Sequence, residues 1–242
     1  MVSSLNYNIT MSAFSEFSLI IFTYNEGKSL AKVIESSFTF MEGVASVFEI
    51  LIVDDGSNDN TSNILEKYIN NQNIRIIKHP KNLGIGNALK TGYKNSRYKY
   101  VCAIPGDGQF DINELSLIPE FTEEFFYSFY RKNKNYNAYR QLLTFINYKF
   151  NSYFLNLKLK DVNWIKVYHN YTLKKIDLVL TSSLIESEIC GKLIKMNIKG
   201  IEVPSEYLER KYGVPKGGNI KTLTKALIEV FKLWRLIIKF KK

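Results

Sequence analysis

Short apolar runs alternate with segments of helical periodicity through the first half of the chain, and this alternation restricts the fold more than any other feature. The runs are rich in β-branched and aromatic residues, as buried strands are, and they occupy residues 17–22, 49–57, 73–79 and 100–104. Between them, apolar residues recur every three or four positions, which predicts helices. Short links between such elements predict an α/β fold with a mostly parallel sheet and helices on both faces.

Polar residues follow three of these strands at the point where each strand ends. The clusters are Thr23-Tyr24-Asn25-Glu26, Asp54-Asp55-Gly56-Ser57 and Asp107-Gly108-Gln109. Ligands bind such sheets beyond the carboxyl ends of the strands, so three clusters on one edge predict a pocket there. Turn formation and helix capping are the competing interpretation for any single cluster, because Asp, Asn, Ser and Gly are common turn residues.

Asp107 and Gln109 place a carboxylate and an amide at the end of the fourth strand. Mg²⁺ and similar hard cations take oxygen ligands, often only one or two from protein, while phosphate oxygens and water complete the shell. The two residues therefore suit a divalent metal that shares its ligands with a diphosphate. A polar turn without metal is the alternative.

Gly84 and Gly86 follow the third strand and open a helix, as glycines do in dinucleotide-binding loops. The third glycine of that fingerprint would fall at Leu89, so we do not expect a nicotinamide or flavin site. Cys102 and Cys190 are the only cysteines. They provide neither a disulfide framework nor a cysteine metal cluster, which suits a reducing compartment.

The second half of the chain is less regular. We expect a strand at 125–131 that ends in Arg131, a helix at 138–157, and another at 186–198, followed by an extended segment and a loop at 211–219. Arg131, Arg210, Lys211 and Lys216 lie in or beside these turns and loops. Cationic side chains on a loop suit a leaving diphosphate or a phosphate acceptor, whereas solvated surface charge is the alternative.

The formal net charge of +10 indicates an anionic partner, either nucleic acid, a phospholipid surface or a phosphorylated substrate. The basic residues are dispersed and form no recognisable nucleic-acid motif, so we expect no nucleic-acid partner. The N-terminus lacks the features of a signal peptide, and no apolar run approaches the ~18 residues of a membrane-spanning helix.

Residues 220–242 form a basic amphipathic segment. Its apolar stripe consists of Leu223, Leu227, Phe231, Trp234 and Ile238. A basic face beside a Trp/Phe/Leu face is typical of a helix that lies in a membrane interface. A helix that packs its stripe on the domain core is an equally good interpretation.

Six motifs occur in the order found in family 2 glycosyltransferases with the GT-A fold. They are SLIIFTYNE, EILIVDDGSNDNT, NLGIGNALKTGY, GDGQFD, KDVNWIKVYHN and the segment from ESEICGKL to KYGVPKGGN. The chain resembles most closely the branch that contains dolichyl-phosphate mannosyltransferase and bacterial polyprenyl-phosphate glycosyltransferases. The resemblance covers residues 17–220 and implies a Rossmann-like GT-A domain at 17–219, after an N-terminal extension at 1–16.

The resemblance also implies roles for single residues. Tyr24, Glu26 and Asp54 match positions that hold the nucleoside of the donor, and Asp107 and Gln109 match a metal site for Mg²⁺ or Mn²⁺. The full donor pocket implied is Thr23, Tyr24, Glu26, Asp54, Asp55, Gly106, Asp107 and Gln109. The residues expected to act on the phosphates are Asp107, Arg131, Arg210 and Lys216, and Glu188 matches an acid in the preceding helix.

Two positions depart from the family pattern. Phe22 stands where the family usually has Pro, and Pro105 stands where the metal motif has its first acid. The second departure removes one carboxylate, so any metal has to rely on Asp107, Gln109 and the donor phosphates.

The resemblance implies inverting, metal-dependent transfer of a sugar from a UDP- or GDP-sugar to a polyprenyl phosphate for cell-surface glycan or glycoconjugate synthesis. We expect a cytoplasmic protein, peripheral on the membrane through its C-terminal helix, and a separate membrane-protein partner stays open. One alternative is transfer to a sugar hydroxyl, with Asp161, Glu186 or Glu188 as base. Another, motivated by Pro105, is a non-catalytic protein that binds nucleotide or membrane.

Overall fold

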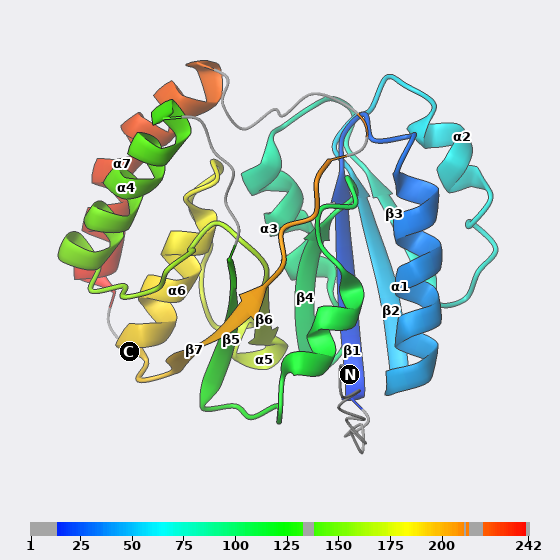
Figure 1. Ribbon diagram of the computed structural model, residues 1–242, viewed down its shortest axis with the longest axis horizontal. Coiled ribbons are helices and arrows are strands. Elements are labelled where there is room, and N and C mark those ends of the chain that lie inside the picture. The colour runs from blue at the N-terminus through cyan, green and yellow to red at the C-terminus, as the bar shows by residue number, and fades with distance from the viewer. Residues whose placement is uncertain (1–13, 133–137, 211, 213–219, 241–242) are drawn as a thin grey trace, which may run out of the picture.

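The computed structural model describes residues 14–132, 138–210, 212 and 220–240, with a seven-stranded sheet at its centre (Figure 1). The strands lie in the order β3-β2-β1-β4-β6-β5-β7. Their bounds are β1 Phe14–Thr23, β2 Ala45–Asp54, β3 Ile74–Lys78, β4 Tyr100–Pro105, β5 Phe125–Arg131, β6 Lys166–His169 and β7 Lys199–Ser205. β6 runs antiparallel to both β4 and β5, and the other pairings are parallel. The predicted mostly parallel sheet is confirmed.

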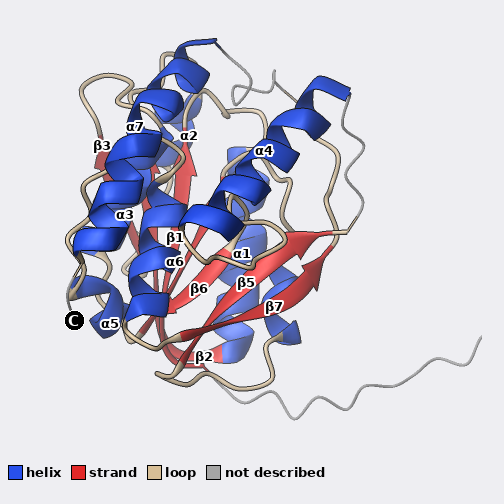
Figure 2. Cartoon of the chain, turned by 90° about the vertical axis from the view of Figure 1, so that its left-hand side faces the viewer, coloured by secondary structure: helices blue, strands red, loops and turns tan. Residues whose placement is uncertain are grey.

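Helices cover both faces of the sheet, as the alternating pattern predicts (Figures 1 and 2). They are α1 Leu30–Val44, α2 Thr61–Glu66, α3 Ile85–Asn95, α4 Ala138–Phe154, α5 Asn170–Lys174, α6 Ile185–Lys195 and α7 Ile220–Lys239, with a 3-10 helix at Ile112–Leu117. One buried core joins the sheet to α1, α2 and the 3-10 helix, and the other joins it to α3, α5, α6 and α7.

β1 shows how the sequence builds both cores. Phe17, Leu19 and Ile21 pack in the core beneath α1, whereas Ile20 packs in the core beneath α3. Successive side chains of a strand point to opposite faces, so a strand that is apolar at every position has to be covered on both sides. The continuous run of apolar residues is thus the reason that this strand lies at the centre of the sheet.

Several elements differ in extent from their sequence-based bounds. β1 begins at Phe14 rather than Phe17, within the segment expected to be an N-terminal extension. Residues 162–169, which belong to the motif KDVNWIKVYHN, contribute only the short strand Lys166–His169. The expected extended segment is β7, which pairs with β5 and widens the sheet.

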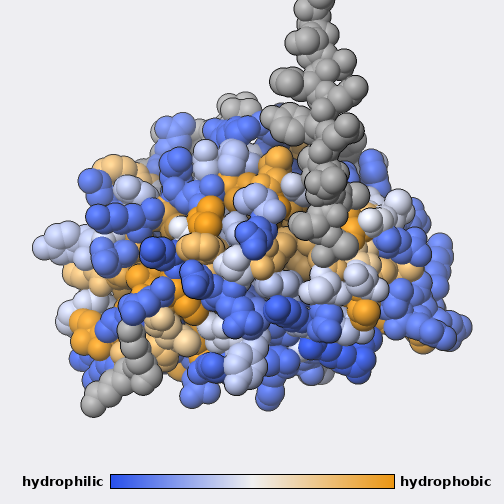
Figure 3. All heavy atoms as spheres, turned by 90° about the horizontal axis from the view of Figure 1, so that it is seen from below, coloured by the Kyte–Doolittle hydropathy of each residue, from blue (hydrophilic) through white to orange (hydrophobic). Residues whose placement is uncertain are grey.

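α7 packs on the domain through a different stripe from the one expected. Leu233 and Ile237 are buried against α6, whereas Phe231, Trp234 and Ile238 of the expected stripe are exposed. The side chains of Leu223 and Leu227 lie outside the described part of the chain. None of the described helices is long and apolar enough to cross a membrane. Seen from below, the surface is largely hydrophilic and is interrupted by apolar patches (Figure 3).

Residues 179–182, between α5 and α6, have all four backbone N–H groups bound by carboxylates. Glu188 of α6 accepts from the first two at 2.8–3.1 Å, and Glu229 of α7 accepts from the last two at 3.0–3.4 Å. Burial acts to raise the pKa of Glu229, but hydrogen bonds from Ser182 and Thr181 outweigh it and lower the pKa. The segment is therefore held in place by two carboxyl side chains from two different helices.

Gly86, near the start of α3, packs directly on this segment. A Cβ atom there would lie 2.3 Å from the carbonyl carbon of Thr181 and 2.4 Å from the carbonyl oxygen of Ser182. No side chain fits against backbone at that distance. The glycine thus serves close packing rather than a dinucleotide fingerprint.

We predict that Gly86→Ala lowers the free energy of unfolding by roughly 1–3 kcal/mol, because the bound segment cannot move away without losing its hydrogen bonds. The matched control is Gly43→Ala in α1, where a Cβ would meet nothing within 4 Å. We expect that change to be neutral or stabilising by up to about 1 kcal/mol. Urea unfolding of the two variants compares them, and equal midpoints would contradict the close-packing role.

Candidate functional site

The loops after β1 and β2 are tied together by hydrogen bonds. Asn25 donates its backbone N–H to the Ser57 hydroxyl at 2.9 Å, and its side-chain oxygen accepts from Asn58 N at 2.7 Å. Asn25 has a φ of 53°, a left-handed conformation that asparagine tolerates better than most residues. The polar cluster after β1 thus begins with a turn that fixes its position relative to the cluster after β2.

The loop after β4 is joined to the same corner. The Ser29 hydroxyl donates to the carbonyl oxygen of Gly106 at 2.8 Å, and Gly106 N donates to Phe22 O at 3.0 Å. A side chain at Gly106 would lie about 3.0 Å from the Thr23 hydroxyl, so the glycine permits this close approach. The expected convergence of three strand-end clusters is present in the structure.

The adjacent acids Asp54 and Asp55 differ in what binds them. Asp55 is fully engaged inside the fold: it contacts His79 at 2.7 Å and accepts from Leu83 N and Gly84 N at 2.9 and 2.8 Å. It therefore holds the turn before α3.

Asp54 is more available to a ligand. One oxygen accepts from Ser57 N at 3.0 Å. The other is buried without a hydrogen bond, and Lys78 Nζ lies 3.9 Å from it. The hydroxyl of Thr23 beside it is also buried without a partner. Buried polar atoms without partners cost free energy, and here they fit a polar ligand at the end of β1 and β2.

Asp107 and Glu26 share one cation. The guanidinium of Arg210 contacts Asp107 Oδ2 and lies 3.2 Å from Glu26 Oε1. Both acids are at least nine-tenths buried, and the Arg210 side chain is 15% exposed. The structure thus brings Arg210, from after β7, onto residues from the ends of β1 and β4. Its Nε is buried without a hydrogen bond.

Gln109 and Arg131 are connected through Tyr207. The side-chain amide of Gln109 donates to the Tyr207 hydroxyl at 2.6 Å. Arg131 lies 5.3 Å from the ring of Tyr207 and 4.6 Å from that of Trp164, measured to the ring centroids. It also donates to both oxygens of Asp161 at 2.7 and 3.0 Å. This aromatic and acidic surround fixes Arg131 at the end of β5.

Asp107 and Gln109 suit a divalent cation only with help from a ligand. Among the described residues no group of three or more His, Cys, Asp or Glu side chains could hold a metal. Asp107 Oδ1 accepts from Gln109 N at 3.0 Å, and its other oxygen is bound by Arg210. One carboxylate and one amide can hold Mg²⁺ or Mn²⁺ when a diphosphate supplies further oxygens.

The acids considered as bases for a hydroxyl acceptor are engaged within the fold. Asp161 is bound to Arg131, and Glu188 is fully buried with Lys192 at 2.6 Å. Glu186 accepts from the hydroxyls of Tyr93 and Tyr168 at 2.8 and 2.5 Å.

Burial raises the pKa of both of these tyrosines, and it raises the pKa of the neighbouring Cys190 thiol to about 12. The two tyrosine hydroxyls and the thiol therefore keep their protons, and the cluster around Glu186 is a buried, hydrogen-bonded part of the core.

Lys216 lies outside the described residues, and Tyr24 is half-buried at the site. Sequence reasoning did not find Tyr207 or Trp164, which lie against Gln109 and Arg131. It also did not pair Arg210 with Glu26. These contacts join residues from distant parts of the chain, and no local pattern indicates them.

The sequence profile of glycosyl transferase family 2 matches residues 18–177, about two thirds of the chain. The chain belongs to this family. The matched region contains the ends of β1, β2, β4 and β5, which carry Glu26, Asp54, Asp107 and Arg131. Arg210 lies beyond it.

Known relatives and structures are consistent with this family. The chain is similar to a dolichyl-phosphate β-glucosyltransferase of Trichomonas vaginalis, 32% identical over 102 residues, which cover 40% of this chain and 30% of the relative. The chain spans only about a third of the length of the dolichyl-phosphate β-glucosyltransferases that it matches.

Two solved structures show the same fold. Mannosyl-3-phosphoglycerate synthase of Rubrobacter xylanophilus superposes with a TM-score of 0.68 at 15% identity, over 94% of this chain and 76% of that one. The mannosyltransferase PcManGT of Pyrobaculum calidifontis, solved with GDP-Man and Mn²⁺, has a TM-score of 0.63 at 14% identity, over 96% and 66%. The expected GT-A architecture is confirmed.

We predict that Arg210→Ala raises the affinity for Mn²⁺ in the absence of donor by roughly three- to tenfold, because it removes a cation that occupies Asp107. Isothermal calorimetry with Mn²⁺ alone measures this. The control is Arg75→Ala, which removes a guanidinium paired with Glu49 at 2.6 Å on β2 and β3. Unchanged Mn²⁺ affinity in the Arg210 variant would show that the two cations do not compete.

Proposed function

We propose that this chain transfers a sugar from a nucleoside diphosphate sugar to a polyprenyl phosphate, with inversion at the anomeric carbon. The observation that carries the proposal is the meeting of Glu26, Asp54, Asp107 and Arg210 at the carboxyl edge of the sheet in a family 2 chain. Nucleotides bind doubly wound sheets at this edge. The order β3-β2-β1-β4 puts the reversal of the strand order between β1 and β4, two parallel strands that are followed by Glu26 and Asp107.

The donor is proposed to lie across the ends of β1, β2 and β4. The unpartnered Asp54 oxygen and Thr23 hydroxyl provide polar groups for the nucleoside, with Tyr24 and Glu26 beside them. Asp107 and Gln109 would hold Mg²⁺ or Mn²⁺ together with the donor diphosphate, and a bound metal neutralises charge on the leaving group. PcManGT, with its GDP-Man and Mn²⁺, supports the choice of metal and donor class.

Arg210 is proposed to leave Asp107 and bind the diphosphate when the donor enters. In the structure its guanidinium neutralises two acids, and a donor with its cation would displace it from Asp107. The planar guanidinium binds phosphate oxygens in pairs, so it can stabilise the leaving nucleoside diphosphate. Lys216, from the same stretch of chain, is proposed to assist. Glu26 remains to fix the position of Arg210.

Arg131 is proposed to orient the acceptor phosphate. Arg131 is the last residue of β5, and its contacts with Asp161 and Trp164 fix its guanidinium in place. An oxygen of the phosphate monoester forms the new bond to the anomeric carbon while the bond from that carbon to the donor diphosphate breaks. A phosphate monoester has its second pKa near ~6, so it is largely ionised at neutral pH and needs no strong base.

The engagement of the three candidate bases within the fold favours phosphate over hydroxyl as the acceptor. The three acids considered for that role are bound to arginine, lysine or tyrosine partners within the described residues. The relatives described as dolichyl-phosphate β-glucosyltransferases also support a polyprenyl phosphate acceptor and make glucose the first sugar to test. We propose that α7 carries the protein to the membrane surface, where that acceptor lies.

Radiolabelled UDP- and GDP-sugars, incubated with polyprenyl phosphate in detergent and with Mg²⁺ or Mn²⁺, test the proposal. The expected product extracts into organic solvent, depends on the metal, and has the opposite anomeric configuration from the donor. A product found only as soluble glycan would favour the hydroxyl acceptor. Bound nucleotide without transfer or donor hydrolysis would favour a non-catalytic protein.

We predict that Asp107→Asn lowers the transfer rate by at least about 100-fold, because it removes the only carboxylate proposed to hold the metal. The matched control is Asp111→Asn. Asp111 lies in the same loop, and its side-chain oxygen accepts from Asn113 N at 3.0 Å, which an amide oxygen can also do. That control should stay within about twofold of the parent. Thermal unfolding of both variants separates loss of chemistry from loss of fold, and retained activity in Asp107→Asn would place the metal elsewhere.

A further inference from the structure

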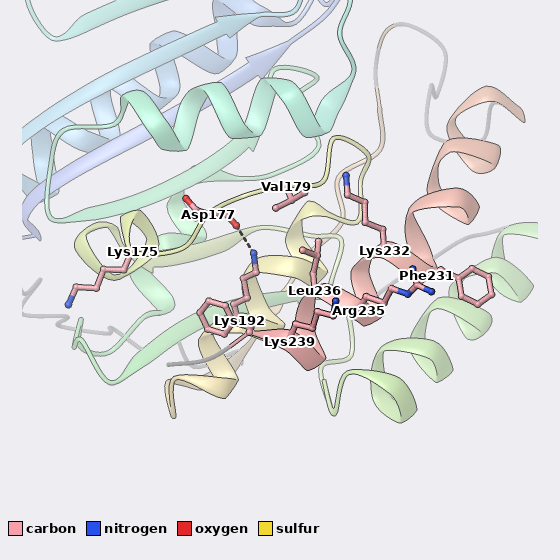
Figure 4. Close-up of a pocket in the computed structure, with 10 residues that line it drawn as sticks. Lys175, Asp177, Val179, Lys192, Phe231, Lys232, Arg235, Leu236 and Lys239 are labelled. Atoms are coloured by element: carbon pink, nitrogen blue, oxygen red, sulfur yellow. Dashed lines mark hydrogen bonds between the residues drawn. The ribbon is translucent and has the colours of Figure 1, made fainter.

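A groove of about 580 Å³ lies between α7, α6 and the segment after α5 (Figure 4). Five of its ten lining residues are cationic and one is acidic. The cations are Lys175, Lys192, Lys232, Arg235 and Lys239. Its floor is apolar, with Val179, Leu236 and Phe240. None of these residues belongs to the site at the sheet edge, so the groove is a separate feature, which we term the basic groove.

Most of this positive charge is not neutralised by protein. Lys192 is the exception, because it is buried and paired with Glu188 at 2.6 Å, and it also donates to the carbonyl oxygen of Asp177 at 2.5 Å (Figure 4). Lys232, Arg235 and Lys239 form no ion pair with any described residue, and their side chains are exposed. Three uncompensated cations over an apolar floor suit a ligand that has both an anionic and an apolar part.

An exposed apolar ridge runs along α7 beside the basic groove. It consists of Ile228, Phe231, Trp234 and Ile238, of which the first two are 77% and 75% exposed. With 3.6 residues per turn, the helix carries three strips: the ridge residues 231, 234 and 238, the basic row 232, 235 and 239, and the buried pair Leu233 and Ile237. Ile228, one turn before Lys232, lies in line with the basic row. Because only the strip with Leu233 and Ile237 packs on the protein, the apolar ridge remains exposed to solvent.

α4 lies on the same side of the molecule as α7 (Figures 1 and 2). Its exposed residues are Phe145, Ile146, Tyr148, Tyr153 and Phe154. Large exposed apolar patches mark binding surfaces. Aromatic residues beside lysine and arginine are the composition of helices that lie in a lipid interface.

We propose that the basic groove binds the headgroup phosphate of an anionic phospholipid while the apolar ridge of α7 enters the lipid surface. The Arg235 guanidinium and the two lysine ammonium groups complement the phosphate charge, and the groove floor accommodates the first carbons of the lipid. An acidic peptide would match the cations but would leave the ridge uncovered. The inference deepens the membrane association included in the proposed function and does not depend on its chemistry.

Vesicle co-sedimentation tests the site with the full chain. We expect binding to phosphatidylcholine vesicles that contain about 30% phosphatidylglycerol and little binding to pure phosphatidylcholine. The reason is that each basic residue near an anionic surface adds its own share of the binding free energy. The triple variant Lys232→Gln, Arg235→Gln, Lys239→Gln should lower the partition coefficient at least about tenfold. Tryptophan emission should shift to the blue on binding, and the shift should be lost in Trp234→Phe.

The matched control removes the same net charge elsewhere. Lys67, Lys81 and Lys94 are exposed, on or beside α2 and α3. Their triple change to Gln should reduce binding by no more than about threefold. Equal losses in the two triple variants would overturn the groove, since net charge alone would then explain binding.

Three further outcomes are decisive. Equal binding to neutral vesicles would mean that the apolar ridge alone binds lipid, and it would overturn the headgroup site. Binding that is blocked by millimolar glycerol phosphate and needs no vesicle would assign the groove to a soluble phosphate, and binding only to native membranes would assign it to a membrane protein. Sugar transfer to a short acceptor in detergent should be unchanged in the groove triple variant, so failure of transfer in the parent would count against the proposed function and leave the groove intact.

Discussion

The site depends on the register of β1 between β2 and β4. Thr23 is paired with Asp54 on one side, and Phe22 is paired with Pro105 on the other. All three strands run in parallel and end at the same height, so the next residues of each must share one corner. The bonds from Asn25 to Ser57 and from Ser29 to Gly106 then fix the loops where parallel pairing stops. A shift of one residue in either pairing would send the acids to the opposite faces of the sheet.

The same register explains how β4 tolerates proline where the family has an acid. Gly106 N donates to Phe22 O, so the backbone nitrogen of the preceding residue points away from β1 and toward the side of β6. There the pairing of β4 with β6 covers only Tyr100 to Cys102. Pro105 lacks an N–H group at a position where the ladder does not use one. Pro105 therefore does not break the strand that positions Asp107.

Arg210 sets the charge balance of this corner. Glu26 and Asp107 are both buried, and buried acids need a counter-charge. Arg210 supplies it from after β7, and thereby connects the donor corner to the β5–β7 half of the sheet. Tyr207, three residues earlier in the chain, likewise joins the two halves, because its hydroxyl accepts from Gln109 and its ring contacts Arg131. The segment that follows β7 therefore joins the proposed donor part of the site to the proposed acceptor part.

Features of the fold that depend on local sequence patterns could be predicted. The alternating runs indicate the sheet and its two helical layers, and the strand-end acids indicate the edge that carries the site. The sequence does not distinguish Asp54 from Asp55, because both stand at the end of the same strand. The turn before α3, which is distant in sequence but adjacent in space, decides which of them is engaged. The sequence also cannot select the buried stripe of α7, because that helix is apolar on two strips and only α6 determines that Leu233 and Ile237 are covered.

Packing of α7 extends, contact by contact, to the donor edge. Glu229 binds the backbone at Thr181 and Ser182, Gly86 of α3 packs on that backbone, and Asp55 binds the turn that leads into α3. Removing α7 would leave two buried N–H groups without acceptors and expose the Leu233 contact surface, so the helix is part of the domain and not an appendage. Its proposed role at a membrane is therefore separable from its structural role only by changing the exposed ridge and the basic row, since truncation would disturb the support of the site as well.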